Sequence, residues 1–240
     1  MKKISIIVIL FCLVAVSSYA QKQDNHEIPL IGARVPTFTA ETTNGTLTFP
    51  DDLGSKWKIL FSHPADFTPV CSSELLELAS LQDEFEAMKV KLVVISTDDL
   101  AKHKSWKESL EAIDYRGKGL QKIKFPLVAD ANKEISRTYG MLHPASNDTK
   151  DVRGVFIVDP NNIVQAIFFY PMGVGRNIDE IKRTVLALQT ANKNVVTPAN
   201  WNPGDDVILS YLTEDEKSEM KQSNSDIYEV SWFMIFRKMR

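Results

Sequence analysis

The chain has 240 residues, of which 44% are hydrophobic and 25% are charged, and its formal net charge is −3. This composition is typical of a folded globular protein and excludes a largely disordered chain. The charge balance lacks the basic excess that nucleic-acid binding requires, so we predict no nucleic-acid partner.

The first twenty residues have the layout of a secretory signal peptide. Basic Lys2 and Lys3 precede an apolar run over 4–16, and small residues lead up to Ala20. The run is shorter than the roughly 20 residues that cross a bilayer, so we predict cleavage near Ala20 rather than a membrane anchor. We therefore expect an exported protein, periplasmic or secreted, with no integral membrane span in the mature chain.

Cleavage would change the cysteine count. It removes Cys12, which bulky Phe11 makes a poor site for lipid attachment, and it leaves Cys71 alone. A single thiol cannot form an internal disulfide. An unpaired cysteine in an exported protein is therefore a candidate reactive group or an intermolecular partner.

Strand and helix patterns alternate over residues 28–192. Asn44-Gly45 is a tight-turn signal and predicts a hairpin over 38–48. Apolar runs bounded by turn signals, and apolar residues at helical spacing, then predict strands at 57–64, 90–97 and 125–130, two strands within 154–171, and helices at 71–88, 98–113, 132–139 and 177–189. This order predicts an α/β domain with a central mixed sheet flanked by helices.

Residues 193–240 read as a small appended α+β module. They contain turn residues, a short apolar strand at 207–209 and a charged helix that starts at Thr213. The aromatic run 232–236 is followed by a basic tip at 237–240. This tail is either a packed strand or a contact for a membrane surface, and the sequence leaves both open.

The surroundings of Cys71 favour a reactive thiol. The preceding strand stops at Pro64, and a helix begins near Cys71, where unpaired N–H groups and the helix dipole favour the thiolate. Thr68 lies three residues earlier, so its hydroxyl can reach a substrate atom beside the sulfur. Pro64 stiffens the loop and excludes solvent. A buried structural cysteine remains the alternative.

Pro64, Thr68 and Cys71 form the pattern P-x-x-x-T-x-x-C between a strand and a helix. This arrangement resembles the active site of the peroxiredoxins, and "FSHPADFTPVC" followed by "SSEL" resembles their one-cysteine branch. Similar blocks follow at "FPLVADANKEISRTYGML", "VRGVFIVDP", "YPMGVGRNIDEIKRTVLALQ" and "VVTPANWNPGDDV". The resemblance implies a thioredoxin-like domain over 28–192 and a C-terminal dimerisation and cover module over 193–240.

The resemblance also implies a role for each site residue. Cys71 is similar to the peroxidatic cysteine, which attacks a hydroperoxide and becomes a sulfenic acid. Thr68 is similar to the residue that hydrogen-bonds peroxide and sulfur, and Pro64 to the residue that shields the sulfur. Arg153 matches the arginine beside the thiolate, where a guanidinium favours the charged sulfur and binds peroxide oxygen.

Three supporting residues have a second interpretation each. Glu74 matches the carboxylate that orients Arg153, but acids are favoured near a helix start anyway. Arg176 matches a second arginine near the pocket, and it is also placed to cap the turn before its helix. His63 stands where the one-cysteine branch carries histidine, and a structural histidine is the alternative.

The resemblance implies a thiol peroxidase that reduces hydrogen peroxide and organic hydroperoxides. Residues 72–240 contain no second cysteine, so the sulfenic acid must be reduced by an external thiol or a thioredoxin-type protein. A homodimer or a higher oligomer is expected. We predict no cofactor, and no metal because the histidines lack ligand spacing.

Two other functions compete with the peroxidase. A redox-triggered holdase or a peroxide sensor would use the same cysteine, so the sequence leaves it open as an alternative. A disulfide oxidoreductase needs C-x-x-C, and Thr68 occupies the position of the first of those cysteines. The preferred peroxide and the physiological reductant are not specified by the sequence.

Overall fold

The computed structural model describes residues 28–147, 149–191, 194–222 and 225–239, so the predicted signal peptide lies outside the described residues. The first part of the chain contains β1 (Phe38–Thr42), β2 (Gly45–Phe49), η2 (Asp51–Leu53), β3 (Trp57–Ser62), α2 (Pro69–Ala87), β4 (Val90–Ser96), α3 (Leu100–Glu111), β5 (Leu127–Ala129), α4 (Glu134–Thr138), β6 (Arg153–Val158), β7 (Val164–Tyr170) and α5 (Ile178–Thr190). The last part contains β8 (Val195–Val196), β9 (Val207–Leu209), α6 (Glu214–Glu219), β10 (Ile227–Ser231) and β11 (Met234–Arg237).

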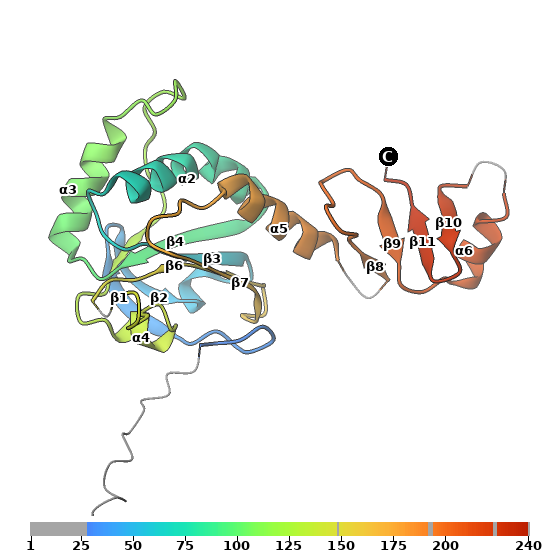
Figure 1. Cartoon of the computed structure of the whole chain (residues 1–240), viewed down its shortest axis with the longest axis horizontal. Coiled ribbons are helices and arrows are strands. Elements are labelled where there is room, and N and C mark those ends of the chain that lie inside the picture. Colours follow the sequence, from blue (N-terminus) through green and yellow to red (C-terminus); the bar gives the residue numbers. More distant parts are fainter. Residues whose placement is uncertain (1–27, 148, 192–193, 223–224, 240) are drawn as a thin grey trace, which may run out of the picture.

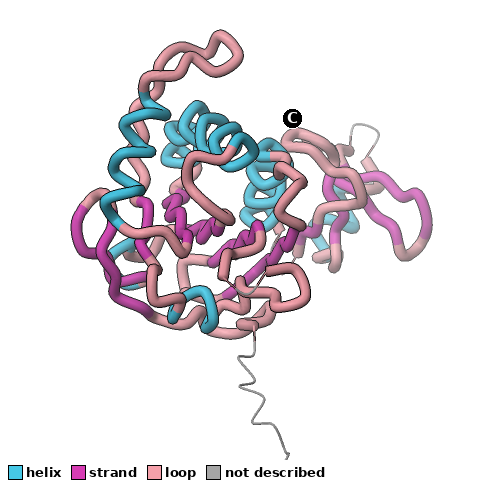
Figure 2. The backbone as a smooth tube through the Cα atoms, turned by 60° about the vertical axis from the view of Figure 1, so that its left-hand side comes forward, coloured by secondary structure: helices cyan, strands magenta, loops and turns pink. Residues whose placement is uncertain are grey.

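Seven strands form one mixed sheet in the order β2-β1-β5-β4-β3-β6-β7. Strands β3, β4 and β5 run parallel, whereas β1 and β6 run antiparallel to their neighbours in that group. The helices α2 and α3 lie on one side of the sheet and the short α4 lies on the other, as two views show (Figure 1, Figure 2). The predicted α/β class with a mixed central sheet is confirmed.

Each face of the sheet has its own apolar core. Side chains alternate along a strand, so Ile59 and Phe61 of β3 face the core of α2, α3 and α5, while Leu60 faces the core of α4 and the N-terminal hairpin. Nearly all of β3 is buried. This burial explains why the strand reads as a continuous apolar run rather than an alternating one.

The pairing of β3 with β6 positions the site. Phe61 pairs with Val155 in an antiparallel ladder, so the end of β3 lies beside the start of β6. Ser62 locks this junction, because its hydroxyl donates to the Val152 carbonyl at 2.7 Å and accepts from the Gly154 N–H at 2.8 Å. The loop that follows β3 is thereby fixed next to the first residue of β6.

The C-terminal residues form a second, four-stranded sheet in the order β10-β11-β9-β8. The predicted helix start at Thr213 is confirmed, and Thr213 and Glu216 form a reciprocal capping box. The aromatic run differs from the predicted strand, because Trp232 and Phe233 lie in the turn between β10 and β11. This sheet lies at the end of α5, away from the large sheet (Figure 1). Among the described residues, no helix has the length and apolar character to cross a membrane.

Candidate active site

Cys71 is the third residue of α2, inside its first turn. The helix begins at Pro69, two residues earlier than the helical spacing predicted, because Thr68 is the extended N-cap and proline suits the first helical position. The Cys71 side chain has no exposed surface and lies in the core between α2 and the sheet. Peroxide therefore reaches the sulfur only when neighbouring groups move aside.

Arg153, the first residue of β6, contacts the sulfur. Its Nη1 lies 3.3 Å from Cys71 Sγ and 2.7 Å from Glu74 Oε2. Its Nε and Nη2 donate to the Met172 carbonyl at 2.8 and 2.6 Å. Because four contacts hold the planar guanidinium, it presents a fixed donor and a fixed positive charge to the sulfur.

Glu74 links Arg153 to Arg176. Its Oε1 accepts from the Arg176 N–H at 2.7 Å and from Nε at 2.8 Å, and its Oε2 accepts from Nη2 at 2.7 Å. One carboxylate shared by two guanidiniums leaves one positive charge in excess beside Cys71.

Arg176 is more than a turn cap. Its Nη1 donates to the carbonyls of Ser62 and Gly154 at 2.8 Å each, and its guanidinium stacks 3.3 Å above the ring of Phe61. Burial lowers the pKa of Arg176 from its ordinary value, and the hydrogen bonds to Glu74 oppose that shift. The residue thus ties the ends of β3 and β6 to α2.

Pro64 lies in the loop that leads into α2, and Thr68 is the N-cap of that helix. The Thr68 hydroxyl donates to the Ala65 carbonyl at 2.9 Å, so its proton is already used and its oxygen remains an acceptor. Pro64 is buried directly after His63. Phe67, in the same loop, has φ of 58°, a left-handed conformation that is unusual for a bulky residue and typical of functional loops.

His63 is fully buried and forms no hydrogen bond to Cys71. Neither ring nitrogen has a hydrogen-bond partner, and its ring lies 5.0 Å from that of Trp106. Its Nε2 lies 3.6 Å from Asp66 Oδ1. Burial holds the pKa of His63 well below its ordinary value, and the charges of His103 and Arg176 add to the effect. The ring is therefore neutral.

The structure also groups residues that the sequence did not single out. Asp66 and His103 are buried beside His63, and Met172 supplies the carbonyl that anchors Arg153. The only local signal for Asp66 is its place in the loop before the helix. No spacing signal links His103 to this loop, because the fold alone brings α3 there.

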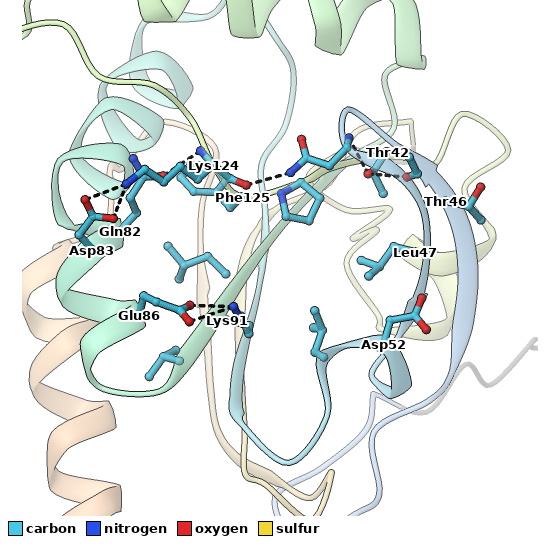
Figure 3. Close-up of a pocket in the computed structure, with 16 residues that line it drawn as sticks. Thr42, Thr46, Leu47, Asp52, Gln82, Asp83, Glu86, Lys91, Lys124 and Phe125 are labelled. Atoms are coloured by element: carbon cyan, nitrogen blue, oxygen red, sulfur yellow. Dashed lines mark hydrogen bonds and ion pairs between the residues drawn. The ribbon is translucent and has the colours of Figure 1, made fainter.

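A separate cavity of about 600 Å³ lies between the β1–β2 hairpin and α2. Figure 3 shows an apolar wall that includes Leu47 and a polar rim where Glu86 pairs with Lys91, and Asp83 with Lys124. None of the predicted site residues lines this cavity. It is therefore distinct from the Cys71 site.

Comparison with known proteins agrees with this geometry. Residues 31–167 match the AhpC/TSA family, and residues 187–223 match the C-terminal domain of 1-Cys peroxiredoxin. A peroxiredoxin of Methanosarcina mazei is 45% identical over 215 residues, which cover 88% of this chain and 98% of the relative. The mitochondrial peroxiredoxin of Saccharomyces cerevisiae is 37% identical over 228 residues, covering 91% of this chain and 84% of that protein.

Solved structures give the same result. The yeast mitochondrial 1-Cys peroxiredoxin matches with a TM-score of 0.74 and 36% identity over 87% of this chain and 99% of that one. Peroxiredoxin 6 of Arenicola marina matches with a TM-score of 0.75 and 32% identity over 88% and 98%. The chain therefore belongs to the peroxiredoxins, thiol peroxidases of thioredoxin-like fold, and to their one-cysteine branch.

Proposed function

We propose that Cys71 is the peroxidatic residue of an exported one-cysteine peroxidase, whose oxidised form is reduced by an external thiol. The contact of Arg153 Nη1 with Cys71 Sγ at 3.3 Å carries this proposal. Placement in the first turn of α2 supports it, because both the helix terminus and the guanidinium favour a thiolate. Cys71 is also the one free cysteine among the described residues.

The chemistry is a nucleophilic displacement on oxygen. The Cys71 thiolate attacks the terminal oxygen of a hydroperoxide, the O–O bond breaks, and the leaving alkoxide takes a proton to become an alcohol or water. Arg153 donates to the peroxide oxygen as negative charge develops there. The Thr68 hydroxyl oxygen accepts from the peroxide O–H, and Pro64 keeps solvent away from the sulfur.

The sulfenic acid then requires two external thiols. The first forms a mixed disulfide with Cys71 and releases water, and the second displaces Cys71 and restores the thiol. The yeast mitochondrial relative is described as resolved by glutathione and thioredoxin systems. That description supports a small thiol or a thioredoxin-type protein as the class of reductant for this chain.

Export is supported by the layout of residues 1–20, which ends in Ser18-Tyr19-Ala20 before Gln21. Mass spectrometry of the protein recovered from the native compartment tests it. A mature N-terminus at or near Gln21 supports export, and an intact Met1 with cytosolic recovery contradicts it.

A homodimer is supported by exposed apolar groups on the C-terminal module. Tyr211 and Trp232 are 72% and 83% exposed, and Phe233 is 64% exposed. Covering such groups in a partner subunit removes apolar surface from water. Analytical ultracentrifugation should give twice the mass of one chain, and replacing Trp232 and Phe233 with serine should shift the protein toward monomer. A monomeric wild-type protein would exclude the dimer.

A peroxide-consumption assay with a panel of reductants tests the peroxidase and separates it from the sensor alternative. Wild type with glutathione or a thioredoxin should turn over many equivalents of hydrogen peroxide and cumene hydroperoxide. A sensor or holdase would oxidise once and remain oxidised. Failure of every thiol reductant to support turnover, despite rapid oxidation of Cys71, would favour that alternative.

A further inference from the structure

A second cluster of polar side chains is buried beside the Cys71 site. His63 lies in the loop between β3 and α2, Asp66 lies in the same loop, and His103 lies on α3. All three are buried, with exposed fractions of 0%, 3% and 0%. One potential ligand atom from each lies within 4.8 Å of the others.

The cluster has unmet hydrogen-bonding capacity. Both ring nitrogens of His63 and Oδ1 of Asp66 are buried without a hydrogen-bond partner. Leaving such groups unpaired is unfavourable, so native proteins nearly always satisfy them. Two of these three atoms face each other, because His63 Nε2 lies 3.6 Å from Asp66 Oδ1. A bound species between them would remove this cost.

The two oxygens of Asp66 point to different histidines. Oδ1 faces His63, and Oδ2 lies 2.7 Å from His103 Nδ1. His103 Nε2 lies 3.0 Å from the Val128 carbonyl, which only accepts, so Nε2 carries the proton. Nδ1 is thereby directed at Asp66. A histidine that gives its far N–H to a backbone carbonyl is oriented as metal-binding histidines are.

The distances suit a small ion. Bonds of about 2.0–2.2 Å in a tetrahedral site place ligand atoms about 3.4 Å apart. The pair His63 Nε2 and Asp66 Oδ1, at 3.6 Å, is close to that separation. His103 Nδ1 and Asp66 Oδ2, at 2.7 Å, are held closer by a hydrogen bond and would move apart around an ion. One nitrogen from each imidazole and one Asp66 oxygen supply three donor atoms. Imidazole with one carboxylate is a donor set of zinc rather than of magnesium or calcium.

The surrounding charges can hold a divalent ion. Asp66 contributes one negative charge, and buried Asp98 lies against it, accepting from the Asp66 N–H at 2.7 Å. Asp98 is also paired with Lys102 and Lys150, and the Arg176 guanidinium acts on His63 from the other side. These cationic side chains weaken the binding of a metal ion, but the carboxylates of Asp66 and Asp98 remain beside the site.

We propose that His63, Asp66 and His103 bind a divalent transition-metal ion of the zinc class. The ion fastens the loop that carries Pro64 and Thr68 to α3. This makes its role structural, and a water completes the four-coordinate shell beside the three protein ligands. Binding displaces the proton shared by Asp66 and His103, as metal binding to such ligands does. This assignment is independent of the redox chemistry at Cys71.

Zinc binding to the mature chain tests the proposal. Chelator-treated protein should take up about one Zn²⁺ per chain by calorimetry and elemental mass spectrometry. Zn²⁺ should also raise the midpoint of thermal unfolding, since it binds the native state only. Asp66→Asn and His103→Gln should each weaken binding by about a hundred-fold or more. Crystals grown with Zn²⁺ should show anomalous density between the three side chains.

Two control variants test whether Zn²⁺ binds to this cluster or to side chains elsewhere in the chain. Cys71→Ser should bind Zn²⁺ as wild type does, although it cannot react with peroxide, so the metal result does not depend on the peroxidase. His143→Gln removes a histidine that bonds the Gly140 carbonyl, outside the cluster, and should also leave binding unchanged. The proposal fails if wild type binds no Zn²⁺ and its crystals show only water in the cluster. It also fails if binding disappears in Cys71→Ser and survives in Asp66→Asn.

Discussion

Arg153 places its guanidinium 3.3 Å from the sulfur of Cys71, although 82 positions separate the two residues in the chain. The antiparallel pairing of β3 and β6 creates this contact, because it sets the start of β6 beside the loop that leads into α2. The same guanidinium is fixed by Glu74 and by the Met172 carbonyl. The sulfur therefore meets a preorganised cation rather than a mobile one.

Replacing Arg153 with glutamine should slow the reaction with peroxide by about a hundred-fold or more. The variant loses both the charge that favours the thiolate and the donor for the peroxide oxygen. Stopped-flow measurement of peroxide consumption gives the rate, and ultraviolet absorbance against pH gives the thiolate fraction. Arg183→Gln is the matched control, because Arg183 pairs with Glu180 on α5. Equal rates for both variants would refute the role of Arg153.

Replacing Glu74 with glutamine should destabilise the fold by about 3–5 kcal/mol, because it leaves two buried guanidiniums without their shared carboxylate. Urea unfolding at neutral pH measures the loss. Glu84→Gln on the same helix removes a surface pair with Lys182 and should cost about 0–1 kcal/mol. A loss no larger than that of the control would show that Glu74 contributes no network stability.

Arginine-to-lysine substitutions should distinguish the roles of Arg153 and Arg176. Arg176→Lys cannot reproduce the bidentate bonds to Glu74 or the two carbonyl contacts, so it should lower stability by about 2–4 kcal/mol. Arg153→Lys should chiefly slow peroxide reduction, since only Arg153 contacts the sulfur. Unfolding experiments on both variants measure the loss of stability, and stopped-flow experiments measure the loss of rate. A larger rate loss in Arg176→Lys would reverse the assignment.

Asp151 gives the protein a distinctive pH dependence. Its carboxyl is fully buried without a hydrogen-bond partner, and burial raises its pKa well above the ordinary value. Nearby Ser136 and Lys150 lower that pKa, and Asp130 and Asp98 raise it. The Ser136 hydroxyl donates to Asp130 at 2.6 Å, so the two carboxyls compete for one hydroxyl proton.

The direction of the stability change with pH depends on how many protons Asp151 binds in the native and in the unfolded state. Above about pH 4 the unfolded chain loses the Asp151 proton while the native chain keeps it, so this group's contribution to stability falls as pH rises, up to its native pKa. Asp151→Asn is always neutral and lacks that decline. Its stability relative to wild type should therefore increase with pH by about 1.4 kcal/mol per unit within that window. Urea unfolding across pH measures this difference, with exposed Asp83→Asn as the flat control. Parallel profiles for wild type and Asp151→Asn would contradict it.

Local patterns predicted most of the elements. The strand at 207–209 and the cap at Thr213 were found because apolar runs and capping residues act within a few positions. A strand over 232–236 is one of the two interpretations that the sequence allows, because Trp232 and Phe233 carry no glycine, proline or asparagine turn signal. Its central turn arises from the pairing of β10 with β11, which local periodicity does not report.

The site residues also differ in how far local sequence predicts them. The helix terminus at Cys71 could be inferred from the adjacent loop, whereas Arg153 and Arg176 were assigned by resemblance, since nothing local marks them. The grouping of Asp66 with His103 escaped prediction altogether. Its two members lie 37 positions apart and meet only because α3 packs beside the loop after β3.

Single-turnover oxidation of the mature, prereduced protein tests the central claim most directly. With no reductant present, wild type should consume about one equivalent of hydrogen peroxide, and a sulfenic-acid trap should label Cys71 in the peptide mass spectrum. Cys71→Ser should consume none above the buffer rate and carry no label. Consumption by Cys71→Ser at the wild-type rate, or a label on any other residue, would contradict the account.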